Sequence, residues 1–336
     1  MESTLVLYAE FLGKPAWLWF LFLGLVLTLL VLDLGVLNRG EKTPGVARSL
    51  WMSAFYIAIA CAFGVFVWTE LGSESGINYF TGFFVEKTLA LDNIFVIGLI
   101  FTYFAIPEAL RHRVLFWGIL GVIVLRAIMI GLGAALIENF AWTLWLFGAF
   151  LLITGVKMLL IGDKPHAIED NPVLKLLRRH MRVTEGLHGS RFLVRLPDPA
   201  TGRKVVWATP LFLALALVEI ADLIFAVDSV PAIFAITTDP YIVYTSNIFA
   251  ILGLRALYFA LAAMIHRFRY LKPALALVLI FIAGKIFWNQ VFGKLDPVIS
   301  LSVTATLLAG GVLVSLVRTR LDTDVNETNA PVKETL

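Results

Sequence analysis

Two short segments of this sequence combine acidic and polar side chains in the same order. In each segment two acids lie six residues apart, and a residue with a side-chain oxygen follows the second acid. These residues are Glu86, Asp92 and Asn93 in the first segment and Asp222, Asp228 and Ser229 in the second. Carboxylate, amide and hydroxyl oxygens are hard ligands that suit Mn²⁺, Ca²⁺ or Mg²⁺. We therefore predict a cation site whose core ligands are the four acids.

The surroundings of these segments narrow the chemistry further. Glu219 precedes Asp222 by three residues and is a candidate secondary ligand or part of a proton path, because intramembrane carboxylates can relay protons. No Cys or His lies near the acids, which disfavours Zn²⁺ and Cu⁺. An anion would be repelled here unless Arg126 and Arg255 bound it.

The acids are embedded in strongly apolar sequence. Of the 336 residues, 60% are hydrophobic and 15% are charged, and the mean hydropathy is +0.88, whereas soluble domains carry roughly 25% charged residues. Runs of about 20 apolar residues can cross a bilayer as helices. We place such runs at 16–37, 48–68, 79–104, 114–137, 141–161, 207–236, 244–265, 273–292 and 298–317. The fold class predicted is an all-α polytopic membrane bundle of about nine transmembrane helices.

Ionisable residues inside these runs are costly. A charge at the bilayer centre costs about 2.5–3.5 kcal/mol even on an insertion scale, so each must face the bundle interior, pair, or bind an ion. The acids are Asp33, Glu86, Asp92, Glu219, Asp222 and Asp228, and the bases are Lys87, Arg126, Lys157, Arg255 and Lys285. We expect Arg126 and Arg255 to pair with the acids, and the lysines either to pair or to extend toward an interface. A purely structural salt-bridge network is the alternative to a cation site.

The residues that follow the acids also recur in a second copy. With the two acidic segments aligned, Leu125-Arg126-Ala127 corresponds to Leu254-Arg255-Ala256, and Lys157 corresponds closely to Lys285. The third and sixth expected helices cross the membrane in opposite directions, so the two three-helix units are predicted to be inverted copies. Inverted repeats are typical of secondary transporters, whose substrate site lies near the midplane where the repeats meet.

Helical geometry limits how the acids can share an ion. At about 100° per residue, Glu86 lies on one helix face with Asn93, and Asp222 lies on one face with Ser229. The second acid of each pair is turned about 120° from the first. Either a neighbouring helix completes the site, or the helix is broken at Pro231, which removes a backbone hydrogen bond. A simple packing kink at Pro231 is equally consistent with the sequence.

Basic residues predict the orientation of the chain. Loops on one side of the expected helices carry 20 Lys and Arg residues, against two, Lys14 and Lys294, on the other side. Since Lys and Arg mark the cytoplasmic side, the N-terminus is expected outside and the C-terminus inside. In the long basic loop, Val173–Met181 predicts a short amphipathic helix, and Arg191–Leu196 and Lys204–Trp207 predict a hairpin.

These patterns divide the chain into four regions. They are 1–161 with the first five spans (first repeat unit 79–161), the cytoplasmic basic loop 162–206, 207–317 with the last four spans (second repeat unit 207–292), and a disordered tail 318–336.

Several function classes are disfavoured by what the sequence lacks. The single cysteine, Cys61, excludes a disulfide fold and a two-cysteine redox relay. The sequence contains no ATP-binding motif and no recognisable catalytic motif. We therefore expect no enzyme activity, no cofactor and no nucleic-acid partner. The expected partners are the lipid bilayer and a divalent metal ion, and a proton or voltage gradient would drive transport.

Three segments resemble signature motifs of the TerC family: Glu86–Val96, Phe225–Ala235 and Thr245–Phe259. The resemblance runs from the first expected helix to the ninth, and within the family it is to an Alx-like bacterial branch. It implies a multi-pass protein of the bacterial inner membrane that is similar to manganese exporters. The motif positions that it implies are Glu86, Asp92, Asn93, Glu219, Asp222, Asp228 and Asn247.

Two hypotheses follow. The first is a Mn²⁺ exporter, with Ca²⁺ as an alternative ion, in which Asn93, Ser229 and Asn247 act as secondary ligands. Manganese and the outward direction rest on the resemblance, because the residues alone favour only a hard divalent cation. The second is a membrane protein that transports nothing, and either delivers metal to exported proteins or acts as a scaffold in metal or tellurium stress.

Overall fold

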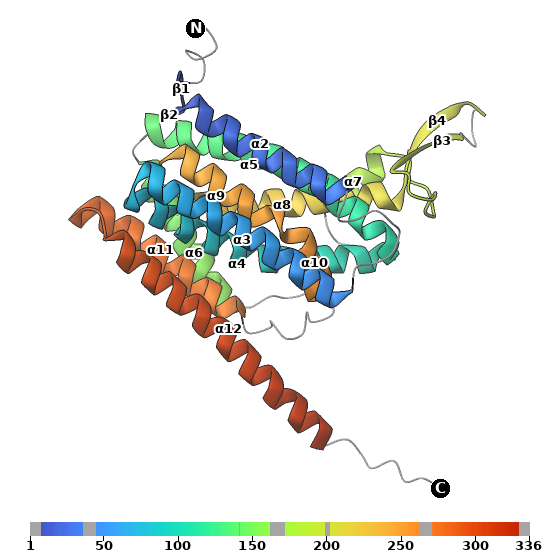
Figure 1. Cartoon of the computed structure of the whole chain (residues 1–336). Coiled ribbons are helices and arrows are strands. Elements are labelled where there is room, and N and C mark those ends of the chain that lie inside the picture. The colour runs from blue at the N-terminus through green and yellow to red at the C-terminus, as the bar shows by residue number, and fades with distance from the viewer. Residues whose placement is uncertain are drawn as a thin grey trace.

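The computed structural model describes residues 8–35, 45–140, 142–161, 172–198, 202–262 and 271–328. Within these ranges the chain forms long helices and two small antiparallel hairpins (Figure 1). The elements in chain order are β1 (Glu10–Phe11), β2 (Lys14–Pro15), α2 (Ala16–Gly35), α3 (Val46–Leu71), α4 (Ser73–Tyr103), α5 (Glu108–Asn139), α6 (Thr143–Ile161), α7 (Pro172–His180), β3 (Leu193–Pro197), β4 (Lys204–Ala208), α8 (Pro210–Phe234), α9 (Pro240–Leu252), α10 (Leu254–Ala262), α11 (Leu271–Phe292) and α12 (Pro297–Thr328).

The fold is an all-α polytopic membrane bundle, as the hydropathy pattern predicts. Each expected span overlaps a helix, and the seventh covers both α9 and α10. Seven segments of the described chain are long and apolar enough to cross a membrane, and α2 adds a shorter apolar stretch, Ala16–Leu32. The helix α4 spans 31 residues but contains Glu86 and Lys87, which lower its hydropathy. The total of nine crossings stays a prediction.

The helix α9 lies inside the bundle, in contact with α2, α3, α4 and α5 (Figure 1). In the segment Pro240–Ala260, 89% of the most apolar stretch is buried inside the protein. In Thr143–Leu160 of α6, 22% of the corresponding stretch is buried. Outer helices instead expose large apolar side chains, such as Leu160 at 80% and Trp51 at 78%. Apolar surface of this extent suits lipid rather than water.

Small residues let the inner helices approach closely, as is common between membrane helices. A Cβ added at Gly82 of α4 would lie 2.9 Å from Ser246 Oγ of α9. A Cβ at Gly155 of α6 would lie 3.0 Å from the carbonyl oxygen of Ala276 in α11. These glycines therefore set the α4–α9 and α6–α11 spacings.

The helix contacts can be compared with the expected repeat, in which α4 to α6 correspond to α8 to α11. Counterparts pack on each other in all three cases: α4 on α8, α5 on α9 and α10, and α6 on α11. The contact of α4 with α9 has its counterpart in the contact of α8 with α5. This is the pairing that a two-fold relation between the units requires. The inverted symmetry itself stays a prediction.

The C-terminal region differs from the expected disordered tail 318–336, because α12 continues to Thr328. Figure 1 shows this helix extending away from the other helices. Residues 312–328 contain no Gly or Pro, so nothing in the sequence interrupts a helix that is already formed. The remaining residues, 329–336, lie outside the described chain.

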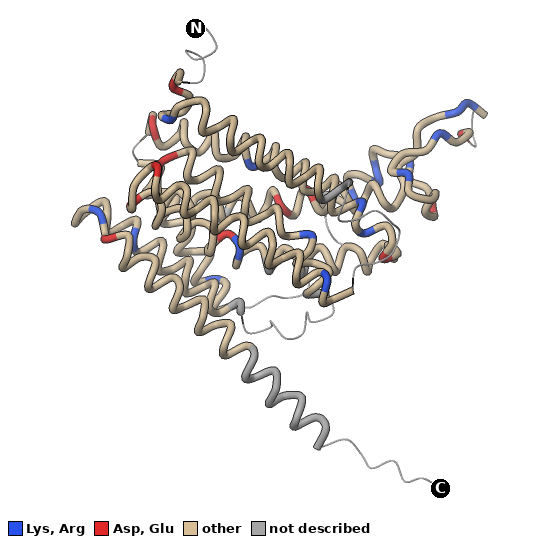
Figure 2. Tube along the Cα trace, in the orientation of Figure 1, with Lys and Arg blue, Asp and Glu red and all other residues tan. Residues whose placement is uncertain are grey.

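The described part of the 162–206 loop contains the helix α7 and the β3–β4 hairpin. Strand β3 pairs antiparallel with β4, with Leu193 opposite Ala208 and Pro197 opposite Lys204. Arg182 stabilises the hairpin through an ion pair with Asp198, in which Nη1 and Oδ2 are 2.7 Å apart. Lys and Arg residues gather at this end of the molecule (Figure 2).

Candidate functional site

A buried arginine connects the two acidic segments. Arg126 of α5 is 1% exposed, and its Nη1 lies 2.7 Å from Oε1 of Glu86 on α4. Its Nε lies 3.4 Å from Oδ2 of Asp222 on α8. One guanidinium thus bridges the carboxylates of Glu86 and Asp222, which lie on two helices and are 136 residues apart in the chain.

Two polar side chains extend this cluster. Ser229 Oγ accepts a hydrogen bond of 2.6 Å from Arg126 Nη1, and Asn93 Nδ2 donates one of 3.3 Å to Asp222 Oδ1. The structure therefore brings Glu86 and Asn93 together with Asp222 and Ser229, each pair presented by one helix face as the seven-residue spacing predicts. We call Glu86, Asn93, Arg126, Asp222 and Ser229 the central cluster.

The central cluster answers the question raised by Pro231. The helix α8 runs through Pro231 to Phe234, so no break at this position creates the site. A neighbouring helix completes it instead, because Arg126 comes from α5 and bonds to groups on both α4 and α8. Proline removes one backbone hydrogen bond of the helix. Adjacent helices can compensate for this loss, which is why proline is tolerated inside membrane helices.

The central cluster is not fully satisfied. Glu86 Oε2 and Asn93 Oδ1 are buried and have no hydrogen-bond partner among the described residues. Two carboxylates also face a single guanidinium, which leaves an excess negative charge among the described side chains of the central cluster. Buried polar atoms are nearly always bonded, so unpartnered oxygens beside excess negative charge are suited to a cation or an ordered water.

Glu219 lies one helical turn from Asp222, against α5. A Cβ built at Gly121 would overlap the Glu219 carboxylate, so only glycine at 121 leaves space for this side chain. Within the part of the chain that the structure describes, Glu219 Oε2 is buried without a hydrogen-bond partner. Sequence analysis assigned Gly121 no role, since glycine occurs in membrane helices for many reasons. The contact shows that Gly121 positions a carboxylate.

Asn247 lies on α9 and is 0% exposed, and neither its Oδ1 nor its Nδ2 has a hydrogen-bond partner in the described ranges. The parallel contacts of α4 with α9 place it at a similar level to the central cluster. Gly82 faces Ser246, and Lys87 Nζ donates a 3.0 Å hydrogen bond to the carbonyl oxygen of Ala250. Asn247 therefore carries two further polar atoms, unpartnered within the described chain, into the interior of the bundle.

The other bases named from the sequence occupy different environments. Arg255 of α10 and Lys285 of α11 are buried, with 4% and 5% exposure, whereas Lys157 of α6 is exposed. The two lysines that correspond in the expected repeat thus differ in burial. Lys87, for which an interface was one expectation, instead turns inward to the end of α9.

Asp92 and Asp228, both expected as core ligands, have side chains outside the described part of the chain, and so does Asp33. Among the described residues, no group of three or more His, Cys, Asp or Glu side chains is arranged to hold a metal ion. The part of the expected cation site that the structure describes is therefore the central cluster, together with Glu219 and Asn247.

A narrow cavity adjoins the central cluster. Its polar lining residues are Asn93 and Asp222, and its walls are apolar side chains and Gly118 from α4, α5, α8, α9 and α10. Its volume of about 20 Å³ has room for about one water molecule. The cavity therefore leaves space for one water molecule beside Asn93 and Asp222.

Comparison with known proteins gives one matching family model and several similar membrane proteins. A family model described as "Integral membrane protein TerC family" matches residues 71–323. An uncharacterized membrane protein of Rickettsia bellii is 47% identical over 300 residues, which cover 89% of this chain and 97% of the relative. Another from Myxococcus xanthus is 45% identical over 308 residues, covering 92% and 94%.

A further relative carries a functional name. Alx of Escherichia coli K12, which is named as a proposed membrane-bound redox modulator, is 45% identical over 282 residues, covering 81% of this chain and 86% of Alx. No solved structure matches the chain.

Proposed function

This chain belongs to the TerC family of integral membrane proteins, and we propose that it is a secondary transporter that exports Mn²⁺ through the central cluster. The observation that carries the proposal is the set of buried carboxylates, Glu86 and Asp222, whose only described cationic partner is Arg126. Buried acids in a membrane bundle are costly unless they pair or act on an ion. Here the pairing is incomplete among the described side chains, since none of them bonds to Glu86 Oε2.

Arg126 has a defined part in this proposal. In the state without an ion, its guanidinium pairs with Glu86 and Asp222 and keeps the central cluster closed. An entering cation competes for the same carboxylates, so Arg126 must release at least one of them. Release of the ion lets the arginine return. Ion binding is thereby coupled to a rearrangement between α4, α5 and α8, as alternating access requires.

The chemistry of the ligands supports a hard divalent ion. Carboxylates from Glu86 and Asp222, with the amide oxygen of Asn93 and the hydroxyl of Ser229, are oxygen donors of the kind that Mn²⁺ and Ca²⁺ prefer. We propose Asp92, Asp228 and Asn247 as additional ligands. The choice of Mn²⁺ over Ca²⁺, and of export over uptake, follows the resemblance to manganese exporters.

We propose Glu219 as the proton-carrying group. Its carboxylate lies in the space that Gly121 leaves on α5, three residues from Asp222. Proton relays in membrane transporters use acidic side chains in such positions.

The gathering of Lys and Arg at the α7–hairpin end favours that end as the cytoplasmic one. We propose a bacterial inner membrane location, with the N-terminus outside and the C-terminus in the cytoplasm.

Two other functions have been considered. The name of the Alx relative suggests redox modulation, but Cys61 is the only cysteine in this chain, so an internal dithiol cannot form. A metal-binding or scaffold protein that transports nothing is favoured by one observation, the direct Glu86–Arg126 pair, which neutralises charge without a metal. Flux measurements separate this second candidate from a transporter.

The test is Mn²⁺ flux in proteoliposomes with an imposed pH gradient. The purified chain is compared with Asp92→Asn and Glu86→Gln, and with Glu70→Gln as a control, because Glu70 is an exposed acid near the end of α3. We expect flux in the unaltered chain and in the control, and strongly reduced flux in the other two. Absence of flux in a well-folded chain would contradict the transport proposal and favour a metal-binding or scaffold protein that transports nothing.

A further inference from the structure

A second polar pocket lies at the end of the bundle near the start of the described chain. Its volume is about 380 Å³, and four separate parts of the chain meet around it: the β1–β2 turn, the first turns of α4, the connection between α8 and α9, and Lys294 in the connection between α11 and α12. Its polar lining includes Glu74, Ser75, Asn78, Thr237, Thr238 and Asp239. We call it the hairpin-end pocket.

The hairpin-end pocket is separate from the central cluster. Glu74 precedes Glu86 by 12 residues on α4, which corresponds to about 18 Å along the helix axis. The two sites therefore cannot share one ion.

Asn78 is the observation that points to a ligand. Its side chain lines the hairpin-end pocket, although the residue as a whole is only 8% exposed. Within the described ranges, its amide makes no hydrogen bond. Because this residue is nearly buried, its amide can take hydrogen bonds from water or a ligand only through the hairpin-end pocket. This amide faces a space that is large enough for both.

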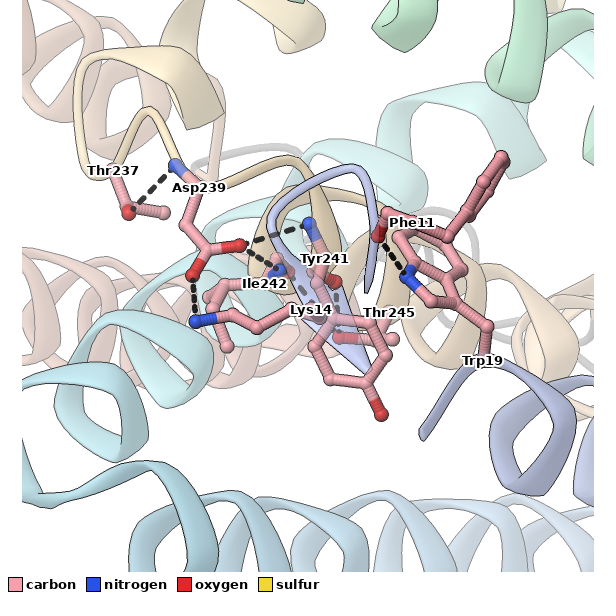
Figure 3. A network of polar contacts seen from close by, with 8 residues as sticks. All are labelled: Phe11, Lys14, Trp19, Thr237, Asp239, Tyr241, Ile242 and Thr245. Carbon is pink, nitrogen blue, oxygen red and sulfur yellow. Dashed lines mark hydrogen bonds and ion pairs between the residues drawn. The ribbon is translucent and has the colours of Figure 1, made fainter. Parts of the chain in front are cut away.

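A lysine lies beside each of the two carboxylates, Asp239 and Glu74, at the edge of the hairpin-end pocket. Lys14 Nζ of the N-terminal hairpin lies 2.9 Å from Asp239 Oδ2, and Figure 3 shows this side chain extending to the carboxylate. On the other side, Lys294 Nζ is 3.9 Å from Glu74 Oε1, and both of these side chains are largely exposed. The Lys14–Asp239 pair is the better sheltered of the two, with 21% and 23% side-chain exposure.

Asp239 is held in place from its other side as well. Its Oδ1 accepts hydrogen bonds from the backbone N–H groups of Tyr241 and Ile242, at 3.0 and 3.4 Å, and so caps the N-terminus of α9 (Figure 3). The backbone N–H of Asp239 donates to Thr237 Oγ1 at 3.2 Å. The cap fixes the position of the carboxylate while Oδ2 remains available to a cation, now the ammonium group of Lys14.

We propose that the hairpin-end pocket binds a hydrated divalent cation, for which Lys14 substitutes when the pocket is empty. The lining supplies carboxylate, amide and hydroxyl oxygens, the donors that such ions prefer. Its volume of about 380 Å³ exceeds the roughly 180 Å³ that six water molecules occupy in the liquid. An ion that retains its water shell therefore fits. The identity of the ion as Mn²⁺ rests on the proposed function, and the existence of the site does not.

A local reporter separates this site from the central cluster. Cys61→Ser removes the native thiol, and Ser73→Cys places a single fluorophore at the exposed start of α4, beside the pocket. Paramagnetic Mn²⁺ quenches the fluorophore only at short range, so titration of the full-length protein in detergent reports binding in the hairpin-end pocket. Glu70→Gln is the control for a general loss of surface charge.

The expected results have opposite signs. Asp239→Asn should weaken binding at least about fivefold, because it removes a ligand charge, and asparagine still caps the helix equally well. Lys14→Gln should tighten binding about fivefold, because it removes the competing ammonium. Asn78→Leu should weaken binding.

A structural ion pair would predict no gain in Lys14→Gln, and an unchanged affinity in that variant would overturn the proposal. Quenching that survives in a protein without Mn²⁺ flux would support the pocket while rejecting the transport proposal.

Discussion

Arg126 Nη1 and Glu86 Oε1 are 2.7 Å apart in the middle of a membrane bundle, and both side chains are 1% exposed. Such a pair gives little net stability when complete, because desolvation of the two charges offsets their attraction. Removal of one partner is different, since it leaves the other charge buried and uncompensated. The pair is therefore a sensitive point at which stability and ion binding can be measured together.

Arg126→Met is expected to lower the free energy of unfolding by about 3–5 kcal/mol, because Glu86 and Asp222 lose their shared cation. Added Mn²⁺ should restore part of this loss by supplying the missing positive charge. Thermal unfolding in detergent with and without Mn²⁺ measures both effects. The double variant Arg126→Met, Glu86→Gln removes one negative charge as well and should be more stable than the single variant. A single variant that Mn²⁺ does not stabilise more than the unaltered chain would contradict a cation site here.

Gly121→Ala tests the placement of Glu219. The added methyl group must displace the carboxylate, because its position is already filled by the Glu219 side chain. We expect overpacking to cost about 1–3 kcal/mol and Mn²⁺ flux to lose its dependence on the pH gradient. Gly131→Ala on the same helix is the matched control, since a Cβ there meets no atom within 4 Å. Equal behaviour of the two variants would remove the positioning role of Gly121.

The sequence predicted the main features of this fold because hydropathy and helical period depend on few residues at a time. Apolar runs of bilayer length located the membrane helices. The seven-residue spacing of Glu86 from Asn93, and of Asp222 from Ser229, put each pair on one face, and the hydrogen bonds confirm that these faces meet. Arg126 was expected as a counter-charge because a buried acid needs one.

Other features depend on which helices are neighbours, and a single sequence does not contain that information. The contact of Gly121 with Glu219 joins α5 to α8, and the bond from Lys87 to Ala250 joins α4 to α9. Pro231 invited an interpretation as a helix break, whereas neighbouring helices allow α8 to continue through it. The length of α12 was missed because polar composition alone does not stop a helix.

Lys87→Met tests the lysine at the end of α9. The helix ends at Leu252 and resumes at Leu254, so the carbonyl oxygen of Ala250 is available to accept the 3.0 Å bond from Lys87 Nζ. Loss of a hydrogen bond to a charged donor should cost about 1.5–3 kcal/mol. Thermal unfolding in detergent measures the loss, with Lys157→Met as the control because Lys157 is an exposed lysine. Similar losses in the two variants would mean that the contact contributes no specific stability.

Asn247→Leu separates a ligand from a structural amide. Both polar atoms of Asn247 are buried without a hydrogen-bond partner among the residues that the structure describes, so their replacement by an apolar group of similar size should leave stability unchanged or raised. As a proposed ligand, however, Asn247 should be required for flux, and we expect a stable variant with about tenfold weaker apparent Mn²⁺ affinity, which corresponds to about 1.4 kcal/mol. Ser246→Ala is the control, because its Oγ already donates to the carbonyl oxygen of Val243. Unchanged flux together with raised stability in Asn247→Leu would show that the amide takes no part in ion binding, and the site would then be confined to α4, α5 and α8.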